Sequence, residues 1–269
     1  MPANPDYPEL TDARQRWRYQ PDPDCLKDQV ILVTGAGDGI GGTAARTFAL
    51  HGAHVILLGR TRSKLEAVFD WIAERTDTQP VIVPCDLLAL DDHSADALLE
   101  AVDQGFGRLD GVLHNASLLG PKVPVAHYPS DEWRKVMQVN AYAPFLLTKS
   151  LLPLLQQSPN ASVVMTASSV GRKGRAYWGA YAVSKFALEG LCQVLADEHE
   201  NVNRVRFNSV NPGGTRTAMR VAAYPAEKPD EVPTPESHMD LYLYLFERAS
   251  VGLTGLQLDA RTWAGPQVG

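Results

Sequence analysis

Cysteine is scarce in this chain, and long hydrophobic runs and metal-site histidine spacings are absent. The three cysteines among 269 residues, Cys25, Cys85 and Cys192, show no CxxC spacing, which predicts reduced thiols instead of a disulfide framework. The seven histidines form no HxxxH or HExxH pattern, so we expect no metal site. No apolar run approaches the length that spans a bilayer.

The chain also lacks an excess of positive charge and a secretory signal. Its formal net charge is −6, which argues against nucleic acid or an anionic membrane as a partner. The N-terminus has prolines and acids where a signal peptide needs a basic start and an apolar stretch, so we expect a cytoplasmic protein. Residues 1–24 are predicted to be a flexible arm. The alternative is that their basic and aromatic cluster, Arg14–Tyr19, contacts a partner or a neighbouring subunit.

The apolar fraction of 45% over 269 residues is sufficient for one large core. Strand patterns alternate with helical patterns over residues 25–269. This order predicts the α/β class: a single Rossmann-like domain, a doubly wound parallel sheet of about seven strands with helices on both faces. The predicted strands are Val30–Thr34, His54–Gly59, Pro80–Cys85, Gly111–Asn115, Ser162–Ala167, Arg204–Val210 and a seventh near Gly255–Leu258.

The segment Val30–Leu58 has the order strand, turn, helix, strand, a βαβ unit of the length that a dinucleotide fold needs. Gly35 lets the chain turn sharply off the first strand. Gly39 leaves room for a pyrophosphate, and Gly41 allows close helix packing. The helix that follows would offer free backbone N–H groups to the phosphates.

Tyr181 and Lys185 lie four residues apart in the run GAYAVSKFALEG, which has apolar and small residues at helical spacing. Residues i and i+4 share one face of a helix, so we expect the ammonium to lower the pKa of the phenol. Such a tyrosine can exchange a proton with a carbonyl or alcohol oxygen. An isolated YxxxK is more simply explained by a packing aromatic and a solvated lysine, so this prediction depends on the other motifs.

Those motifs resemble the short-chain dehydrogenase/reductase family. TGAGDGIG at residues 34–41 is similar to the family's TGxxxGIG, and the later motifs follow in the family's order: Asn115 in HNAS, Asn140 in MQVNAY, Ser168 in MTASSVG, the Tyr181/Lys185 pair and PGGT at residues 212–215. The resemblance covers roughly Leu26 to Leu258. The stretches SSVGRKGRAYWGAYAVSKFALEG and NPGGTRTAMR look closer still to the YciK-type bacterial oxidoreductases, a subgroup.

Two positions depart from the family's pattern. The family usually has serine where Gly37 stands, which puts one cofactor hydrogen bond in question. It usually has glycine where Ser117 stands, a small change expected to tighten the pocket on the nicotinamide side.

The resemblance implies an oxidoreductase that interconverts a small-molecule carbonyl and an alcohol by hydride transfer. It makes Tyr181 the acid/base and gives Lys185 two tasks, lowering the tyrosine pKa and binding the nicotinamide ribose. It assigns to Asn140 the role of holding a water molecule that joins Lys185 to solvent. Ser168 would donate to the substrate oxygen and position it.

Ser168 and Ser169 compete for that last role. The family's serine usually lies thirteen positions before its tyrosine and three before a glycine. Ser168 satisfies both spacings, with Tyr181 and Gly171.

The end of the second strand favours NADP(H). NAD-preferring sheets carry an acid there, whereas arginine accommodates a 2′-phosphate. Here Arg60, Arg62 and Ser63 precede the first acid, Glu66. A solvated arginine is the alternative explanation, and NAD(H) stays the second candidate because Asp38 adds no positive charge to the glycine loop. Asp86 is assigned to the adenine amino group, or alternatively to a helix N-cap. The predicted cofactor site comprises Gly35, Gly37, Asp38, Gly39, Ile40, Arg60, Arg62, Ser63, Asp86, Leu87, Asn115, Ala116, Tyr181, Lys185, Pro212, Gly213, Thr215 and Thr217.

The predicted substrate site is Ser168 with Leu118 and Trp178, although the last two could equally be core. The proline-rich segment Val221–Glu236 is expected to form a lid.

Helices over Asp131–Leu155 and Tyr181–Glu198 carry more apolar residues than one core-facing stripe requires. This predicts a homodimer, with a tetramer or burial within one subunit as alternatives. A rival functional hypothesis is a cofactor-binding regulator or scaffold that has the fold but no turnover.

Overall fold

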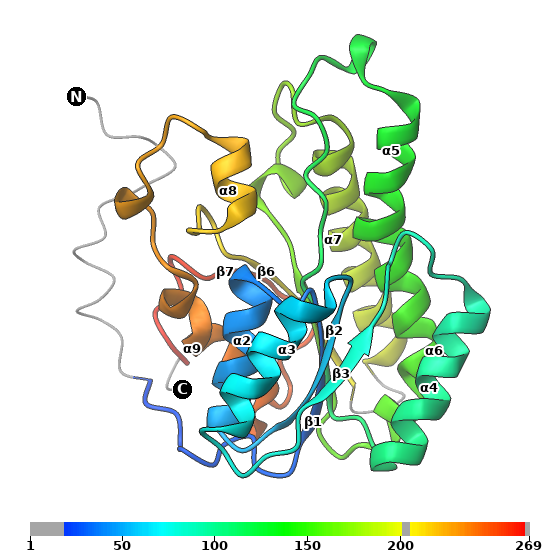
Figure 1. The fold of residues 1–269 in the computed structure, drawn as a ribbon, viewed down its shortest axis with the longest axis vertical. Coiled ribbons are helices and arrows are strands. Elements are labelled where there is room, and N and C mark those ends of the chain that lie inside the picture. The colour runs from blue at the N-terminus through cyan, green and yellow to red at the C-terminus, as the bar shows by residue number, and fades with distance from the viewer. Residues whose placement is uncertain (1–18, 201–204, 267–269) are drawn as a thin grey trace.

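The computed structural model of the protein describes residues 19–200 and 205–266. Within these residues the chain forms one seven-stranded parallel sheet of order β3-β2-β1-β4-β5-β6-β7, which confirms the predicted architecture (Figure 1). The order reverses between β1 and β4, and in open α/β sheets ligands bind at such a point. The strands are β1 (Val30–Thr34), β2 (His54–Gly59), β3 (Val81–Pro84), β4 (Gly111–His114), β5 (Ser162–Thr166), β6 (Arg206–Asn211) and β7 (Gln257–Asp259).

Every predicted strand is present; the first two have the predicted ends, and the ends of the other five differ by at most two residues. The third strand begins at Val81 and not at Pro80, since proline has no N–H to give to the ladder. The fourth ends at His114, because the Asn115 N–H donates to the Thr34 hydroxyl at 2.9 Å. Residues 1–18 of the predicted arm and Arg204 of the sixth predicted strand lie outside the described residues.

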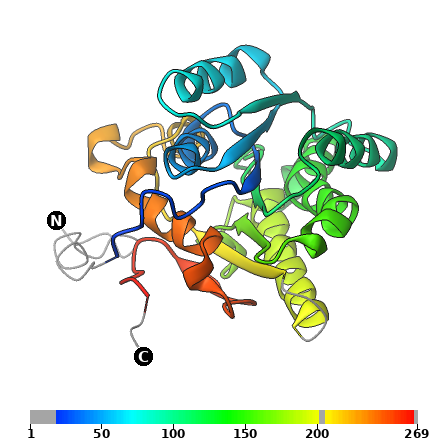
Figure 2. The ribbon, with the colours of Figure 1, turned by 90° about the horizontal axis from the view of Figure 1, so that it is seen from below.

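Helices cover both faces of the sheet (Figure 2). On one face lie α2 (Gly39–Leu50), α3 (Arg62–Ala73) and α9 (Met239–Phe246). On the other lie α4 (Asp92–Phe106), α6 (Ala143–Gln157) and α7 (Gly179–His199). The described helices α5 (Ser130–Met137) and α8 (Ala218–Ala223) complete the set.

The apolar run of β1 explains how one strand serves two cores. All five residues of VILVT are buried. Ile31 and Val33 belong to the core under α2 and α9, whereas Val30 and Leu32 belong to the core under α4 and α6. Successive side chains of a strand point to opposite faces, so an uninterrupted apolar run is typical of a strand buried on both sides.

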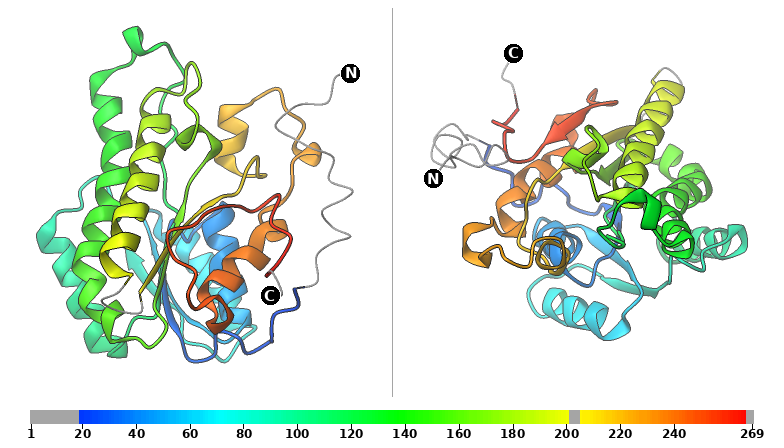
Figure 3. Two further views of the ribbon diagram at one scale, coloured as in Figure 1. Left: turned by 180° about the vertical axis from the view of Figure 1, so that it is seen from behind. Right: turned by 90° about the horizontal axis from the view of Figure 1, so that it is seen from above.

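The described chain ends lie beside α9 (Figure 3). The ring of Tyr19 is 5.6 Å from that of Tyr244 and 5.9 Å from that of Trp263, centroid to centroid. All three cysteines are free thiols. Among the helices of the described residues, none is both long and apolar enough to cross a membrane.

Candidate active site

Two cavities lie at the carboxyl ends of the strands. The first, of about 300 Å³, is lined by residues that follow β1, β4, β5 and β6, and the second, of about 290 Å³, by residues that follow β1, β2, β3 and β4. They adjoin along Gly35, Asp38, Ala116 and Ser117, which line both. The arrowhead of β3 in Figure 1 points toward this end of the molecule, where α8 lies.

Most of the predicted site residues line these cavities. The first is lined by Gly35, Asp38, Gly39, Ile40, Asn115, Ala116, Ser168, Trp178, Tyr181, Lys185, Pro212, Gly213, Thr215 and Thr217. The second is lined by Gly35, Gly37, Asp38, Arg60, Asp86, Leu87, Ala116 and Leu118. Leu118 thus lies in the second cavity, apart from Ser168 and Trp178. Arg62, Ser63 and Asn140 line neither cavity.

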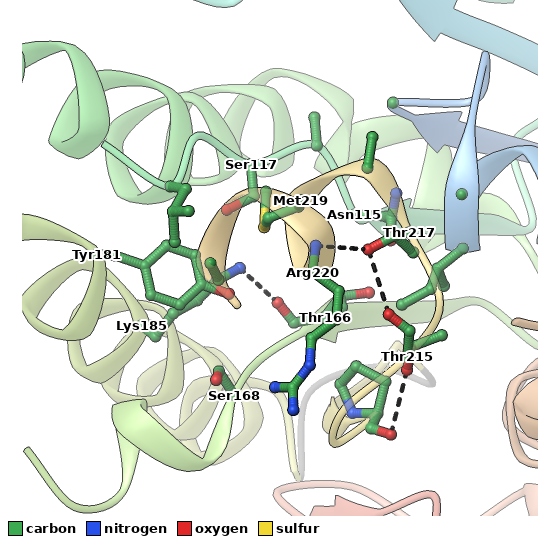
Figure 4. A pocket seen from close by; sticks show the side chains of 18 of the residues that line it. Asn115, Ser117, Thr166, Ser168, Tyr181, Lys185, Thr215, Thr217, Met219 and Arg220 are labelled. Atoms are coloured by element: carbon green, nitrogen blue, oxygen red, sulfur yellow. Dashed lines mark hydrogen bonds between the residues drawn. The ribbon is translucent and has the colours of Figure 1, made fainter. Parts of the chain in front are cut away.

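Tyr181 and Lys185 are buried side by side on the first turns of α7, with Tyr181 8% and Lys185 2% exposed. The Lys185 ammonium donates to the Thr166 carbonyl at 2.7 Å and lies 5.6 Å from the centre of the tyrosine ring. Figure 4 shows both side chains entering the cavity from the same helix. The predicted stacking on one helix face is therefore present.

The expected lowering of the tyrosine pKa is wrong for this structure. Burial raises the pKa of Tyr181 to about 12, and only a hydrogen bond with Ser168 opposes this rise. Burial also lowers the pKa of Lys185 to about 8, against the opposing charge of Glu189. Both groups lie away from water, so desolvation, which disfavours each charged form, outweighs the attraction between them.

Ser168 is the serine that the structure places on the first cavity, and Ser169 is not part of that lining. Ser168 has extended backbone and lies two residues after the end of β5, directly before the short helical turn Ser169–Gly171. A Cβ at Gly171 would lie 2.7 Å from the Cβ of Lys185. Glycine thus lets this turn pack directly against α7.

Asn140 lies in a π-helical turn, Gln138–Tyr142, between α5 and α6, and is 1% exposed. Such bulges interrupt the regular helix and re-aim a side chain. Its Oδ1 accepts from the Leu118 N–H at 2.7 Å, and its Nδ2 donates to the Leu118 carbonyl at 2.9 Å and to the Ser184 hydroxyl at 3.0 Å. The helix is thus irregular at Asn140, and these contacts position the loop that follows β4. Ser184 was not singled out from the sequence.

The glycine-rich turn has the backbone that its residue types predict. Gly35 and Gly39 have φ values of +68° and +53°, a region that favours glycine. A Cβ at Gly41 would collide with the Gly35 carbonyl, so this glycine is required for close packing. The Asp38 carboxylate caps α2 by accepting from the Gly39 N–H at 2.7 Å.

Lys64 is a second-cavity residue that sequence reasoning missed. Its ammonium lies 2.6 Å from the Asp38 carboxylate across the mouth of the glycine turn, and this contact lowers the pKa of Asp38. A Cβ at Gly37 would lie 2.9 Å from the Lys64 Cβ, so the departure from serine gives α3 room beside the turn. Arg62 points elsewhere and pairs with Glu66 at 2.8 Å.

Asp86 does not cap α4, so that alternative is wrong. Asp91 is the N-cap and accepts from the Ser94 N–H. Asp86 instead accepts from the Leu88 N–H at 3.1 Å and lines the second cavity.

The predicted lid contributes little to these cavities. Within Val221–Glu236, only Ala223 lines the first cavity, where α8 adds Ala218, Met219 and Arg220 from just before that segment. The backbone of Ala223 is held by the Lys122 ammonium, 2.8 Å from its carbonyl.

The residues present fit a dinucleotide. The hydroxyl of Ser117 is buried, lines both cavities and has no hydrogen-bond partner among the residues that the structure describes. A ligand rich in hydroxyls and phosphate oxygens would satisfy it where the two cavities meet. Arg60 and Lys64 make one end of the second cavity basic, which suits a phosphate.

Residues 29–228 match the short chain dehydrogenase family. The chain is 51% identical to the uncharacterized oxidoreductase YciK of Escherichia coli K12 over 250 residues, which is 93% of this chain and 98% of that protein. It is 30% identical to levodione reductase of Leifsonia aquatica over 71% of each protein.

The fold is also similar to solved structures. The E. coli YciK structure has a TM-score of 0.87 and 52% identity, and the match covers 90% of this chain and 99% of that chain. A short chain dehydrogenase structure from Shigella flexneri 2a, complexed with NADP, has a TM-score of 0.87 and 51% identity over 89% of this chain and 100% of that chain.

Proposed function

The chain belongs to the short-chain dehydrogenase/reductase family, and we propose that it is an NADP(H)-dependent oxidoreductase that interconverts a carbonyl and an alcohol. One observation carries the proposal. The hydroxyls of Ser168 and Tyr181 and the buried ammonium of Lys185 line a single cavity, and that cavity adjoins a second one with a basic end.

In this mechanism the nicotinamide supplies or accepts the hydride. Ser168 donates to the substrate oxygen and fixes it beside the phenol. Tyr181, with a pKa of about 12, is protonated at neutral pH and donates its proton to that oxygen in the reductive direction. Lys185 binds the nicotinamide ribose. It also stabilises the phenolate that forms when Tyr181 gives up its proton.

NADP(H) is the preferred cofactor in this proposal, with NAD(H) as the alternative. Arg60 and Lys64 line the second cavity, where a 2′-phosphate would lie. The NADP complex of the Shigella relative, and an E. coli CFT073 relative complexed with NADPH, support the same choice. Arg62 and Ser63 line neither cavity, and Arg62 pairs with Glu66, so the proposal gives the phosphate to Arg60 and Lys64.

The proposed assembly is a homodimer. Five apolar side chains remain more than two-fifths exposed on one chain around α6 and α7: Tyr142, Phe145, Val183, Phe186 and Val194. By contrast Val136, Leu146 and Cys192 are buried, so burial within one subunit accounts for only part of the apolar excess. A second copy would cover the rest. The free thiols agree with the cytoplasmic location that the sequence predicts.

The test is NADPH consumption with a panel of ketones, aldehydes and quinones, followed at the nicotinamide absorbance band. Consumption that depends on the carbonyl compound supports the proposal. Tight NADPH binding without consumption across the whole panel would favour the rival hypothesis, a cofactor-binding regulator or scaffold.

A further inference from the structure

Part of the first cavity lies outside the proposed cofactor site. Its lining there is apolar and comes from three segments: the loop after β4, the residue before α7, and α8. The residues are Leu119, Trp178, Ala218, Met219 and Ala223. Since none of them belongs to the predicted cofactor set, this part of the cavity is left for a substrate.

Three of these residues form one apolar surface beside the proposed acid. Leu119, Trp178 and Met219, here called the apolar wall, pack against a buried cluster that includes Tyr181. Figure 4 shows Met219 entering the cavity from α8 and Tyr181 entering it from α7. A group attached to the reacting carbonyl would therefore meet mainly carbon and sulfur atoms.

The ring of Trp178 is held in place by its neighbours. Its centre lies 5.6 Å from that of the Tyr181 ring and 6.0 Å from that of the Tyr224 ring. The Lys122 ammonium lies 4.6 Å from the Trp178 ring centre and donates to the Ala223 carbonyl at 2.8 Å. The apolar wall is thus ordered before a ligand arrives, which lowers the entropic cost of binding.

The charged residues of the first cavity all have partners. Within the described residues its lining contains three of them, Asp38, Lys185 and Arg220. Asp38 pairs with Lys64 at 2.6 Å. Lys185 donates to the Thr166 carbonyl at 2.7 Å, and the proposed mechanism uses it at the ribose.

Arg220 is the charged residue next to the apolar wall, and its charge is balanced by Glu227. The guanidinium donates two hydrogen bonds of 2.6 Å to that carboxylate, and its carbon lies 3.9 Å from the ring centre of Tyr224. A charged substrate group would lose its water here and find its possible counter-ion already paired. Burying a charge without such compensation is costly.

We propose that the substrate is an uncharged carbonyl compound whose apolar group lies against the apolar wall, with the carbonyl at Ser168 and Tyr181. This inference rests on the proposed oxidoreductase function and names its substrate class. The cavity of about 300 Å³ must also hold the nicotinamide, so the apolar group is compact. Its removal from water supplies the binding free energy.

The experiment compares carbonyl compounds in two pairs. Methyl benzoylformate and benzoylformate differ in charge. Cyclohexanone and tetrahydropyranone differ in polarity, because an oxygen replaces the methylene group opposite the carbonyl. Binding to the NADP-loaded protein is measured by calorimetry, and kcat/KM is measured with NADPH.

The apolar member of each pair should bind more tightly. The neutral ester should be favoured over the carboxylate by about tenfold or more, because the carboxylate is buried without a free counter-ion. Cyclohexanone should be favoured over tetrahydropyranone by about threefold or more, the scale of one buried methylene group.

Trp178→Ala and Met219→Ala should each weaken binding of cyclohexanone and of methyl benzoylformate without changing the affinity for NADP. The conservative variants Trp178→Phe and Met219→Leu should retain most of that binding. Val221→Ala, at an exposed position on the same helix as Met219 and outside both cavities, is the matched control. If an alanine variant fails to fold, the two wild-type comparisons decide the proposal alone.

The outcomes separate the two proposals. Equal binding within either pair, tighter binding of the charged or the polar member, or no binding of any compound overturns the apolar site. Reduction of any of these compounds by NADPH would still leave the oxidoreductase function standing. Preferential binding of the apolar members, weakened in the alanine variants and without turnover of any carbonyl, supports the apolar site and contradicts the oxidoreductase function.

Discussion

The side-chain amide of Asn140 holds the backbone of Leu118 at both ends, accepting from its N–H at 2.7 Å and donating to its carbonyl at 2.9 Å. The two residues are 22 positions apart. Their pairing joins the π-helical turn to the loop that carries Asn115, Ala116 and Ser117 along the cavities. Asn140, which lines neither cavity, therefore positions the loop that does.

Asn140→Ala should loosen this loop. Two partly buried backbone groups lose their partners, so we expect a loss of about 1–3 kcal/mol in the free energy of unfolding and a higher KM for NADPH. Urea unfolding and NADPH titration measure the two effects. Ser184→Ala removes the third hydrogen bond of Asn140 but not those to Leu118, and should change the KM less. Wild-type values for both quantities in Asn140→Ala would contradict the positioning role.

Arg60→Ala should weaken NADP binding by roughly 1–3 kcal/mol and barely affect NAD, because only NADP offers a 2′-phosphate to the guanidinium. Lys64→Ala should act in the same direction. Arg75→Ala, on a surface arginine beyond the end of α3, is the control. Calorimetry with both cofactors is the measurement, and equal losses for NAD and NADP would show that Arg60 does not bind the phosphate.

Stability should fall in mild acid because of two buried histidines. Burial lowers the pKa of His238 to about 4 and that of His114 to about 3. Below the unfolded-state pKa of about 6.5, the unfolded chain binds protons that the folded protein does not accept. Each histidine's contribution to the free energy of unfolding is therefore complete above about pH 6.5. Below that pH it falls by up to about 1.4 kcal/mol for each pH unit.

His238→Gln tests this dependence. The free energy of unfolding of the variant should vary less between pH 6.5 and 4 than that of the wild type. His127→Gln, at an exposed histidine, should leave the slope unchanged. Parallel curves for wild type and His238→Gln would show that His238 does not titrate differently in the two states.

The sequence was sufficient for the strands and for most of the cavity lining, because these follow local patterns. An unbroken apolar run such as β1 predicts a strand buried on both faces. The motif residues meet because the carboxyl ends of parallel strands lie at one edge. Tyr181 and Lys185 share a face by helix geometry alone.

Other features depend on burial or on contacts between distant residues. The spacing of Tyr181 and Lys185 indicates proximity but not desolvation, which reverses the expected direction of the tyrosine pKa shift. Lys64 contacts Asp38, which lies 26 positions earlier in the chain, and Gly37 leaves space for the Lys64 side chain. The sequence showed that glycine replaces the family's serine at position 37, but it did not show that this change accommodates Lys64.

Phe186→Glu, and separately Phe145→Glu, should convert a dimer into a monomer by placing charge on the exposed apolar face of α6 and α7. Both phenylalanines are more than two-fifths exposed on one chain. Val125→Glu, at an exposed valine elsewhere, should leave the assembly unchanged. Light scattering at micromolar concentration is the measurement. A single wild-type species at the 29.4 kDa monomer mass would refute the dimer.

The central claim is that Tyr181 transfers the proton in a carbonyl–alcohol interconversion. It is tested most directly by the rate of NADPH-dependent reduction in Tyr181→Phe, on a carbonyl compound that the wild-type protein reduces. The exposed Tyr177 provides the matched control, Tyr177→Phe, which should keep the wild-type rate. The Tyr181→Phe rate should fall by about two to four orders of magnitude, the usual contribution of general acid catalysis, while NADPH still binds. A wild-type rate in Tyr181→Phe would contradict the mechanism.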